Sequence, residues 1–281
     1  MAVKILIDSA SDIDLDEANE LGIELIPMKI TFEDGEFSDG VDLSHKKFFE
    51  KLVESTALPR TSLINEFRFE EEFQKLTADG SEVIAITLSS KLSGTYKCAC
   101  KAAEKFGGRV KVVDSLNASA GERLLCEYAL RLREEGKSAD EIVKELDSQK
   151  HRILVLAVLD TLLYLKKGGR ISAMAAFAGA MLSVKPVIGV MGGEVKLVGK
   201  AMGSKKSNNL LNKFVEEKGI DFNMPHCVIW SGLDDSLMKK YVSDSAALWQ
   251  EHISEVPAYM IGSTIGTHIG PGAVGVAFFA K

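Results

Sequence analysis

Three consecutive residues, Ser93, Gly94 and Thr95, combine groups that could bind an anionic oxygen. The apolar run at residues 83–86 predicts a buried strand before them, and residues 95–106 have the pattern of a helix. Hydroxyls at the start of a helix lie beside unpaired backbone N–H groups and the positive end of the helix dipole. The same residues could equally be simple N-caps, so the local sequence leaves both interpretations open.

A serine nucleophile is another interpretation of this turn. A serine hydrolase needs a sharply turned serine, a histidine base and an oxyanion hole. Ser93 lacks the full G-x-S-x-G elbow. His268 could act as the base, because Gly266 and Gly270 flank it in a predicted loop where the backbone can approach a ligand. A hydrolase or acyltransferase that uses Ser93 with His268 therefore stays open.

Two glycine-containing strings resemble nucleotide-binding motifs but lack the right context. Residues 270–275 fit G-x-G-x-x-G, yet only six residues follow, and they predict a last strand where a dinucleotide site needs a helix. Residues 193–200 resemble a P-loop with five residues between the glycines instead of four, and a hairpin explains them better. No His, Cys or carboxylate group has metal-ligand spacing. We therefore expect no ATP, metal or other cofactor.

The composition is that of an ordinary globular protein. The chain has 281 residues, 46% hydrophobic and 26% charged, with a net charge of −6 and four cysteines. Without a long Lys/Arg tract, this charge argues against nucleic acid as the main partner. The cysteines form no Cys-x-x-Cys pair and the N-terminus lacks a signal-peptide pattern, so we expect a cytoplasmic protein with reduced thiols.

Strand-like and helix-like runs alternate along the chain, which is typical of largely parallel sheets covered by helices. Strands are predicted at residues 3–7, 23–27, 29–32, 83–86, 110–113, 153–158, 184–191, 195–198, 227–230, 258–261 and 274–279. Residues 59–62 are predicted to be a loop. The polar stretch 136–150 separates two halves, so we place an N-terminal α/β domain at 1–150 and a C-terminal α/β domain at 151–281. The segment near 60–80 could pack on the second domain.

The longest apolar run, residues 173–182, is built largely of Ala and Gly. It is too short for a transmembrane helix, which needs roughly 20 residues. The run predicts a buried helix that fills little volume. Such a helix either packs closely against its neighbours or leaves room for an apolar ligand.

Several stretches, taken together, resemble those of one protein family. They are residues 8–12 (DSASD), 61–62 (TS), 88–95 (LSSKLSGT), 113–115 (VDS), 160–171 (DTLLYLKKGGRI), 185–186 (KP) and 266–272 (GTHIGPG). Each is weakly specific alone, but their joint order and spacing are specific. The chain resembles the DegV family, the fatty-acid-binding subunits of bacterial fatty acid kinase, nearly from end to end.

The resemblance implies an α/β fold of two DegV-type domains with a long-chain fatty acid between them. The N-terminal domain is expected to be a three-layer α/β/α unit with a parallel sheet, and the C-terminal domain a two-layer α/β unit with a mixed sheet. A separate ATP-binding kinase subunit is expected to convert the bound acid to an acyl phosphate. The chain itself would then be a lipid-binding protein and not an enzyme, in transient contact with a membrane at most.

The resemblance also implies where the fatty acid binds. Its carboxylate would be held by hydroxyls and backbone at two segments and by one histidine: Thr61, Ser62, Ser93, Gly94, Thr95 and His268. The small-residue run would be the wall of the acyl tunnel. Replacing Ala176 or Gly179 with Phe is therefore expected to weaken long-chain binding.

Two departures from the family pattern bear on function. Many members have Gln-Pro after the Thr-Ser pair, where this chain has Leu63 and Ile64. Members often have an Arg linked to kinase docking after the glycine-rich hairpin, whereas residues 200–206 contain Met202 and no Arg. Arg170 remains as a candidate docking residue. A stand-alone lipid reservoir or sensor is therefore a further alternative.

Overall fold

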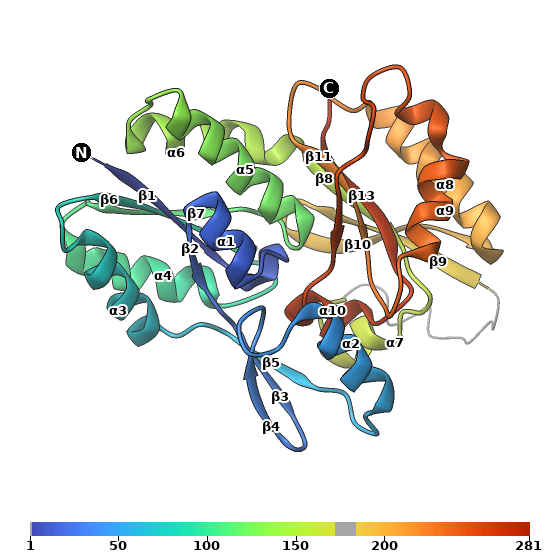
Figure 1. The fold of residues 1–281 in the computed structure, drawn as a ribbon, viewed down its shortest axis with the longest axis horizontal. Coiled ribbons are helices and arrows are strands. Elements are labelled where there is room, and N and C mark those ends of the chain that lie inside the picture. The colour runs from blue at the N-terminus through green and yellow to red at the C-terminus, as the bar shows by residue number, and fades with distance from the viewer. Residues whose placement is uncertain (1, 172–183) are drawn as a thin grey trace.

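The computed structural model describes residues 2–171 and 184–281. The strands within these residues form sheets of four, six and three strands. Helices pack on both larger sheets, and the smaller sheet projects from the region where the two meet (Figure 1).

The first sheet is entirely parallel and belongs to the N-terminal half. Its strands, in spatial order, are β2 (Glu24–Ile26), β1 (Val3–Asp8), β6 (Glu82–Thr87) and β7 (Val110–Asp114). Five of the six β6 residues are buried, as expected for a parallel strand covered on both faces. The helices on its two faces are α3 (Glu66–Thr77) with α4 (Thr95–Ala103), and α5 (Ala120–Glu134) with α6 (Ala139–Gln149). The predicted three-layer arrangement is confirmed.

The second sheet is mixed, as the family resemblance implied. Its strands, in spatial order, are β10 (Glu194–Met202), β9 (Val184–Met191), β8 (Ile153–Val158), β13 (Val274–Phe279), β11 (His226–Trp230) and β12 (Ala258–Met260). Helices α8 (Gly203–Lys218) and α9 (Ser236–Asp244) cover its outer face. β9 and β10 form the predicted hairpin, in which Gly192 and Gly193 both have positive φ.

Side-chain alternation along β8 divides the second sheet between two cores. Leu156 and Val158 pack with α8 and α9 on the outer face. Val155 and Ala157 face the other way and share a core with Ile7 of the first sheet. This division follows from the twofold periodicity of a strand, and it directs the inner face of the second sheet toward the first.

The small sheet was only partly predicted. β3 (Lys29–Phe32) and β4 (Gly35–Ser38) form the hairpin expected from Asp34-Gly35, and β5 (Arg60–Ser62) pairs antiparallel with β3. The prediction of a loop at 59–62 was wrong. A three-residue polar strand has no periodic signal of its own, and its pairing depends on a partner about 30 residues earlier in the chain.

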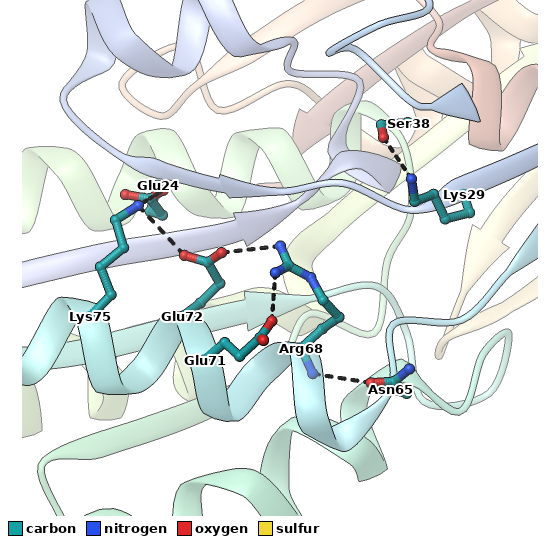
Figure 2. A network of polar contacts seen from close by, with 8 residues as sticks. All are labelled: Glu24, Lys29, Ser38, Asn65, Arg68, Glu71, Glu72 and Lys75. Carbon is teal, nitrogen blue, oxygen red and sulfur yellow. Dashed lines mark hydrogen bonds and ion pairs between the residues drawn. The ribbon is translucent and has the colours of Figure 1, made fainter. Parts of the chain in front are cut away.

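The segment 60–80 divides between two neighbours. β5 lies beside β3, whereas α3 packs on α4 and β6 of the first sheet. Figure 2 shows the outer face of α3, where Lys75 reaches Glu24 of β2 at 2.9 Å and Arg68 pairs with Glu72 at 3.1 Å. Exposed pairs of this kind contribute ~1 kcal/mol or less, so the buried face of α3 holds it to the first sheet. The domain boundary near residue 150 stays a prediction.

The first of the remaining described α-helices lies beside β2 of the first sheet, and the other three contact one another or the small sheet. They are α1 (Leu15–Leu21), α2 (His45–Glu54), α7 (Leu163–Gly168) and α10 (Ser263–Ile269). Helix α10 contacts α7, α2, β3 and β5, so it lies where the two halves of the chain meet. In the part of the chain that the structure describes, no helix is both long enough and apolar enough to cross a membrane.

Candidate functional site

A cavity of about 270 Å³ lies between the two halves of the chain. The inner face of the second sheet contributes Val155, Ala157, Ile188 and Val190, and α10 contributes Ile265 and Ile269. A hydrogen bond joins the two halves beside the cavity. The Ser89 hydroxyl of the first half donates to the Gly193 carbonyl at the tip of the β9–β10 hairpin, at 2.8 Å. The cavity is therefore an apolar space enclosed by elements far apart in the sequence.

Six residues on the cavity wall form what we call the polar cluster. They are Thr61, Ser62, Ser93, Gly94, Arg170 and His268. Thr61 and His268 are 207 positions apart, yet Thr61 Oγ1 lies 3.1 Å from His268 Nε2. A Cβ atom added at Gly94 would lie 3.1 Å from Leu63 Cδ2, so the two segments that carry Thr61 and Ser93 lie side by side. The structure thus brings together five of the six residues proposed to hold a carboxylate.

Thr95 has a different position from the other five. It is fully buried and does not line the cavity. Its hydroxyl lies 2.9 Å from Ser93 Oγ and accepts from the Ile64 N–H at 3.4 Å. Thr95 therefore ties the start of α4 to the residues after β5. It is the first residue of the helix, whose N-cap is Gly94 and has no side chain to act as a cap.

The turn around Ser93 is held in place by two aspartates at the carboxyl ends of parallel strands. Asp8, the last residue of β1, accepts from the Leu88 N–H at 2.8 Å, and Asp114, the last residue of β7, accepts from the Ser90 N–H at 3.0 Å. Ser93 Oγ in turn accepts from the Thr95 N–H at 3.2 Å. Open α/β sheets bind ligands at this carboxyl edge, and the turn is fixed there before a ligand arrives.

His268 was predicted to lie in a loop, and that prediction was wrong. It lies in the last turn of α10, which ends at Ile269. Glycine is a poor helix former, so the sequence Gly-Thr-His-Ile-Gly resembles a loop unless the tertiary contacts of Gly266 are known. A Cβ atom at Gly266 would lie 2.6 Å from Phe48 Cε1, so only glycine lets α10 pack this closely on α2.

The surroundings of His268 keep its ring neutral near pH 7. Burial and, secondarily, the positive charge of Arg170 lower the pKa of His268 to about 4. Gly168 lies against the ring, because a Cβ atom there would overlap His268 Nδ1. Nδ1 itself is buried and has no hydrogen-bond partner among the described residues. The ring is thus a neutral group with one nitrogen bonded to Thr61 and one unused.

The hydrolase alternative requires a contact between Ser93 and His268. In the described ranges, Ser93 Oγ is bonded within its own turn to Thr95, and His268 Nε2 is bonded to Thr61. No hydrogen bond joins the serine and the histidine there. This arrangement presents several neutral polar groups to one place and favours binding over nucleophilic attack.

Arg170 is exposed at the cavity wall. Its Nη1 donates to the Gly168 carbonyl at 2.7 Å, which holds the guanidinium near His268 without an acidic partner among the described residues. The residues predicted as a tunnel wall, Ala176 and Gly179, lie outside the described residues. Within 2–171 and 184–281, no group of three or more His, Cys, Asp or Glu side chains could hold a metal ion.

Sequence reasoning missed a second set of polar residues behind the cavity. We call Asp8, Asp12, Asp39 and Glu122 the buried carboxylates, because each is at most 2% exposed. Asp12 accepts from the Ser119 hydroxyl and, at 2.8 Å, from the Gly262 N–H. The only signal in the sequence was the run of Ser and Asp at 8–12, which predicts a loop and does not predict contacts 250 positions away.

Burial is the main cause of the raised pKa values of Asp8, Asp12 and Glu122. It raises the pKa of Asp8 to about 7 and that of Asp12 to about 6, even though backbone N–H groups partly oppose the effect. Burial also raises the pKa of Glu122, and the nearby Asp8 and Asp12 add to the rise. Both Glu122 oxygens lack hydrogen-bond partners in the described structure. Ser119, which lines the cavity, links this region to the site and has a positive φ of 57°.

Known proteins resemble this chain over its whole length. Residues 2–281 match the family described as "Uncharacterised protein, DegV family". A DegV domain-containing protein of Caldanaerobacter subterraneus subsp. tengcongensis is 34% identical, over 99% of this chain and 99% of its own length.

Solved structures give the same result for the fold. A DegV family protein from Thermus thermophilus, described for its fatty acid binding, has a TM-score of 0.88 at 29% identity and is covered completely, as is this chain. A stearic acid-binding protein from Eubacterium ventriosum has a TM-score of 0.88 at 25% identity, with 100% of this chain and 99% of that chain covered. The chain belongs to the DegV family.

Proposed function

We propose that this protein binds a long-chain fatty acid and presents its carboxylate to a separate ATP-dependent kinase. The observation that carries the proposal is the cavity of about 270 Å³, whose lining is mostly apolar outside the polar cluster. A ligand that fits this division has one polar head group and a long apolar tail. The relatives described as binding fatty acids support the same ligand class.

The polar cluster suits a carboxylate because its groups are mostly neutral donors. Thr61 and Ser93 supply hydroxyls, the backbone near Gly94 supplies the start of a helix, and His268 supplies a ring nitrogen. Such bonds hold the head group without a bidentate Arg–carboxylate pair, which binds more tightly. A carboxylate held in this way keeps an oxygen lone pair available for reaction.

The tail supplies most of the binding free energy. Each buried CH₂ contributes roughly 0.8 kcal/mol, so a 16-carbon chain contributes on the order of 10 kcal/mol before the costs of association are deducted. The walls formed by Ala157, Ile188 and Val190 offer only apolar contacts to such a chain. Binding is therefore expected to depend on chain length more steeply than on any one polar contact.

In the kinase step, the carboxylate oxygen attacks the γ-phosphorus of ATP, the bond to ADP breaks, and an acyl phosphate forms. Phosphoryl transfer is assisted mainly by positioning and by positive charge near the transferred group. Arg170 is the exposed cation of the polar cluster. We assign to it the stabilisation of this charge or contact with the kinase.

Mass spectrometry of the purified protein tests the ligand. A co-purified free fatty acid supports binding, whereas an acyl adduct on Ser93 would instead support the hydrolase alternative. Incubation of the loaded protein with a bacterial fatty acid kinase ATP-binding subunit and labelled ATP then tests the partner. Formation of acyl phosphate supports presentation to a kinase. Fatty acid binding without acyl phosphate would favour a lipid reservoir or sensor.

A further inference from the structure

Helix α10 begins with backbone groups that are bonded by carboxylates from the other half of the chain. Its N-cap residue is Gly262, which has no side chain to act as a cap. Asp39 Oδ1 accepts from the Ser263 N–H at 3.0 Å, and Asp39 Oδ2 accepts from the Thr264 N–H at 2.9 Å. Asp12 Oδ1 accepts from the Gly262 N–H at 2.8 Å. The first turn of α10 is thus capped from more than 200 positions away.

The position of Asp39 is fixed by its burial and by a backbone hydrogen bond. It follows β4 directly, is fully buried, and donates its own N–H to the Met28 carbonyl at 3.0 Å. Both carboxylate oxygens are used on α10, so the side chain has one favoured orientation. An anionic acceptor at the positive end of a helix forms stronger bonds than a neutral cap.

The segment that carries Asp39 contacts α10 at two further places. Phe48 and Phe49 of α2 lie against Gly266, where an added Cβ atom would be 2.6 and 2.8 Å from their rings. Thr61 of β5 lies 3.1 Å from the His268 ring. The small sheet and α2 therefore hold α10 at its start, its middle and its end.

We propose that Asp39 is a positioning residue for His268. By fixing the first turn of α10 it places His268 against Thr61 in the polar cluster. His268 lies four residues after Thr264, so the helix carries the constraint over about 6 Å. A seven-residue helix with a glycine N-cap has little capping of its own, and the loss of Asp39 should move its far end. This inference rests on the proposed function for its ligand, but not for its geometry.

Two measurements on Asp39→Ala test the inference. The first is the affinity for palmitate, measured by displacement of a fluorescent fatty acid, which should fall roughly 10-fold if a buried bond to the head group is lost. The second is the NMR ¹³Cε1 signal of His268, followed over roughly pH 3.5–8 so that both the ordinary and the lowered pKa fall within the range. The signal is assigned by its absence in His268→Gln. Its titration midpoint should rise from about 4 toward the ordinary value of 6.5, because the ring moves out of its buried position.

Two control variants make the result specific. Ser138→Ala removes the cap of α6, far from the cavity, and should lower stability without changing either readout. Asp39→Asn keeps one acceptor oxygen and should give values between wild type and Asp39→Ala. If Asp39→Ala does not fold, Asp39→Asn is judged by the same two readouts.

The outcomes for the inference and for the proposed function differ. An unchanged His268 midpoint together with wild-type affinity, in whichever Asp39 variant folds, would overturn the inference. Equal changes in Ser138→Ala would also overturn it, because they would reflect general destabilisation. Failure of wild-type protein to bind palmitate would instead contradict the proposed function, while the His268 signal would still decide the role of Asp39.

Discussion

The polar cluster at the cavity and the buried carboxylates behind it use polar groups in opposite ways. In the polar cluster, Thr61 and Ser93 are neutral and partly exposed. Thr61 is bonded to His268, and Ser93 is bonded to Thr95 within its own turn. Among the buried carboxylates, Asp39 uses both oxygens on N–H groups of the other half. Asp12 uses one oxygen on Gly262 of the other half and one on Ser119 of its own half. The polar cluster can still form hydrogen bonds to a ligand, whereas the buried carboxylates fix the two halves relative to each other.

This difference indicates that the polar cluster mainly sets ligand affinity, whereas the buried carboxylates mainly set folding stability. A buried charge that loses its partners is costly, so Asp12 and Asp39 stabilise one arrangement of the two halves. Neutral hydroxyls at a cavity wall cost less when unpaired because water can replace a ligand. Substitutions in the two regions should therefore affect different measurements.

The largest expected effect is on folding stability, for Asp12→Ala. The substitution leaves the Ser119 hydroxyl and the Gly262 N–H without their buried acceptor. The free energy of unfolding in urea should fall by about 2–5 kcal/mol, since each orphaned group costs roughly 1–3 kcal/mol.

Asp12→Asn is the matched control. Its carbonyl oxygen can still accept from Gly262, and its amide can donate to Ser119, so most of the stability should remain. If Asp12→Ala is as stable as wild type, the buried carboxylates do not fix the two halves relative to each other.

The next effect is on ligand affinity, for Thr61→Ala and Ser93→Ala. Each removes one hydroxyl from the polar cluster, and fatty acid binding should weaken by roughly 1–3 kcal/mol. Unfolding free energy should change by about 1 kcal/mol, the usual net contribution of one hydrogen bond. Isothermal titration with palmitate and urea denaturation measure the two quantities. Wild-type affinity in both variants would remove Thr61 and Ser93 from the site.

A smaller effect is expected for Glu122→Gln, on the pH dependence of folding stability. The raised pKa means that the protonated carboxyl stabilises the fold at low pH, and this stabilisation is lost as pH rises through the folded-state pKa. Glutamine mimics the protonated form and has no ionisation cost. The variant should therefore be more stable than wild type at pH 8, with little difference at pH 4, as read from thermal melts.

Glu141→Gln serves as the opposite case. Bonds from Ser138 lower the pKa of the exposed Glu141, so its carboxylate favours the fold at neutral pH. Its loss should destabilise slightly at pH 8 and less at pH 4. A gain at pH 8 in both variants would show that the effect is not specific to the buried glutamate.

The smallest expected effect is on the titration of His268. Its lowered pKa makes the neutral ring a stabilising feature that is present above pH 6.5 and is lost as pH falls toward about 4. A bound carboxylate favours the charged ring, so palmitate should raise the NMR midpoint by roughly 1 pH unit, equivalent to about 1.4 kcal/mol. An unchanged midpoint in the loaded protein would show that the head group lies away from His268.

Much of the fold could be predicted from the sequence because its strong elements carry local signals. The buried run of β6 and the capping box of Ser138 and Glu141 appear where the pattern predicts them. The errors fall on short elements with weak signals. β5 and α10 were both predicted as loops, because their conformations depend on pairing with β3 and on packing against Phe48.

The candidate site shows the same division. Motifs near Ser93 and the family resemblance indicated which residues to expect at the site. They did not indicate that Thr95 faces away from the cavity, or that Arg170 lies close enough to His268 to affect its pKa. Those facts depend on side-chain direction and on distances between segments.

The sequence by itself determined the order of the strands and helices with strong local signals, the hydroxyl-rich turn before α4 and the membership of the DegV family. Periodicity, turn chemistry and motif order are local properties, so they can be read along one chain. Only the tertiary structure decided that Thr61 meets His268 across 207 positions, and that Asp39 caps a helix formed by residues 263–269. Such contacts arise when burial brings distant segments together and their polar groups must find partners.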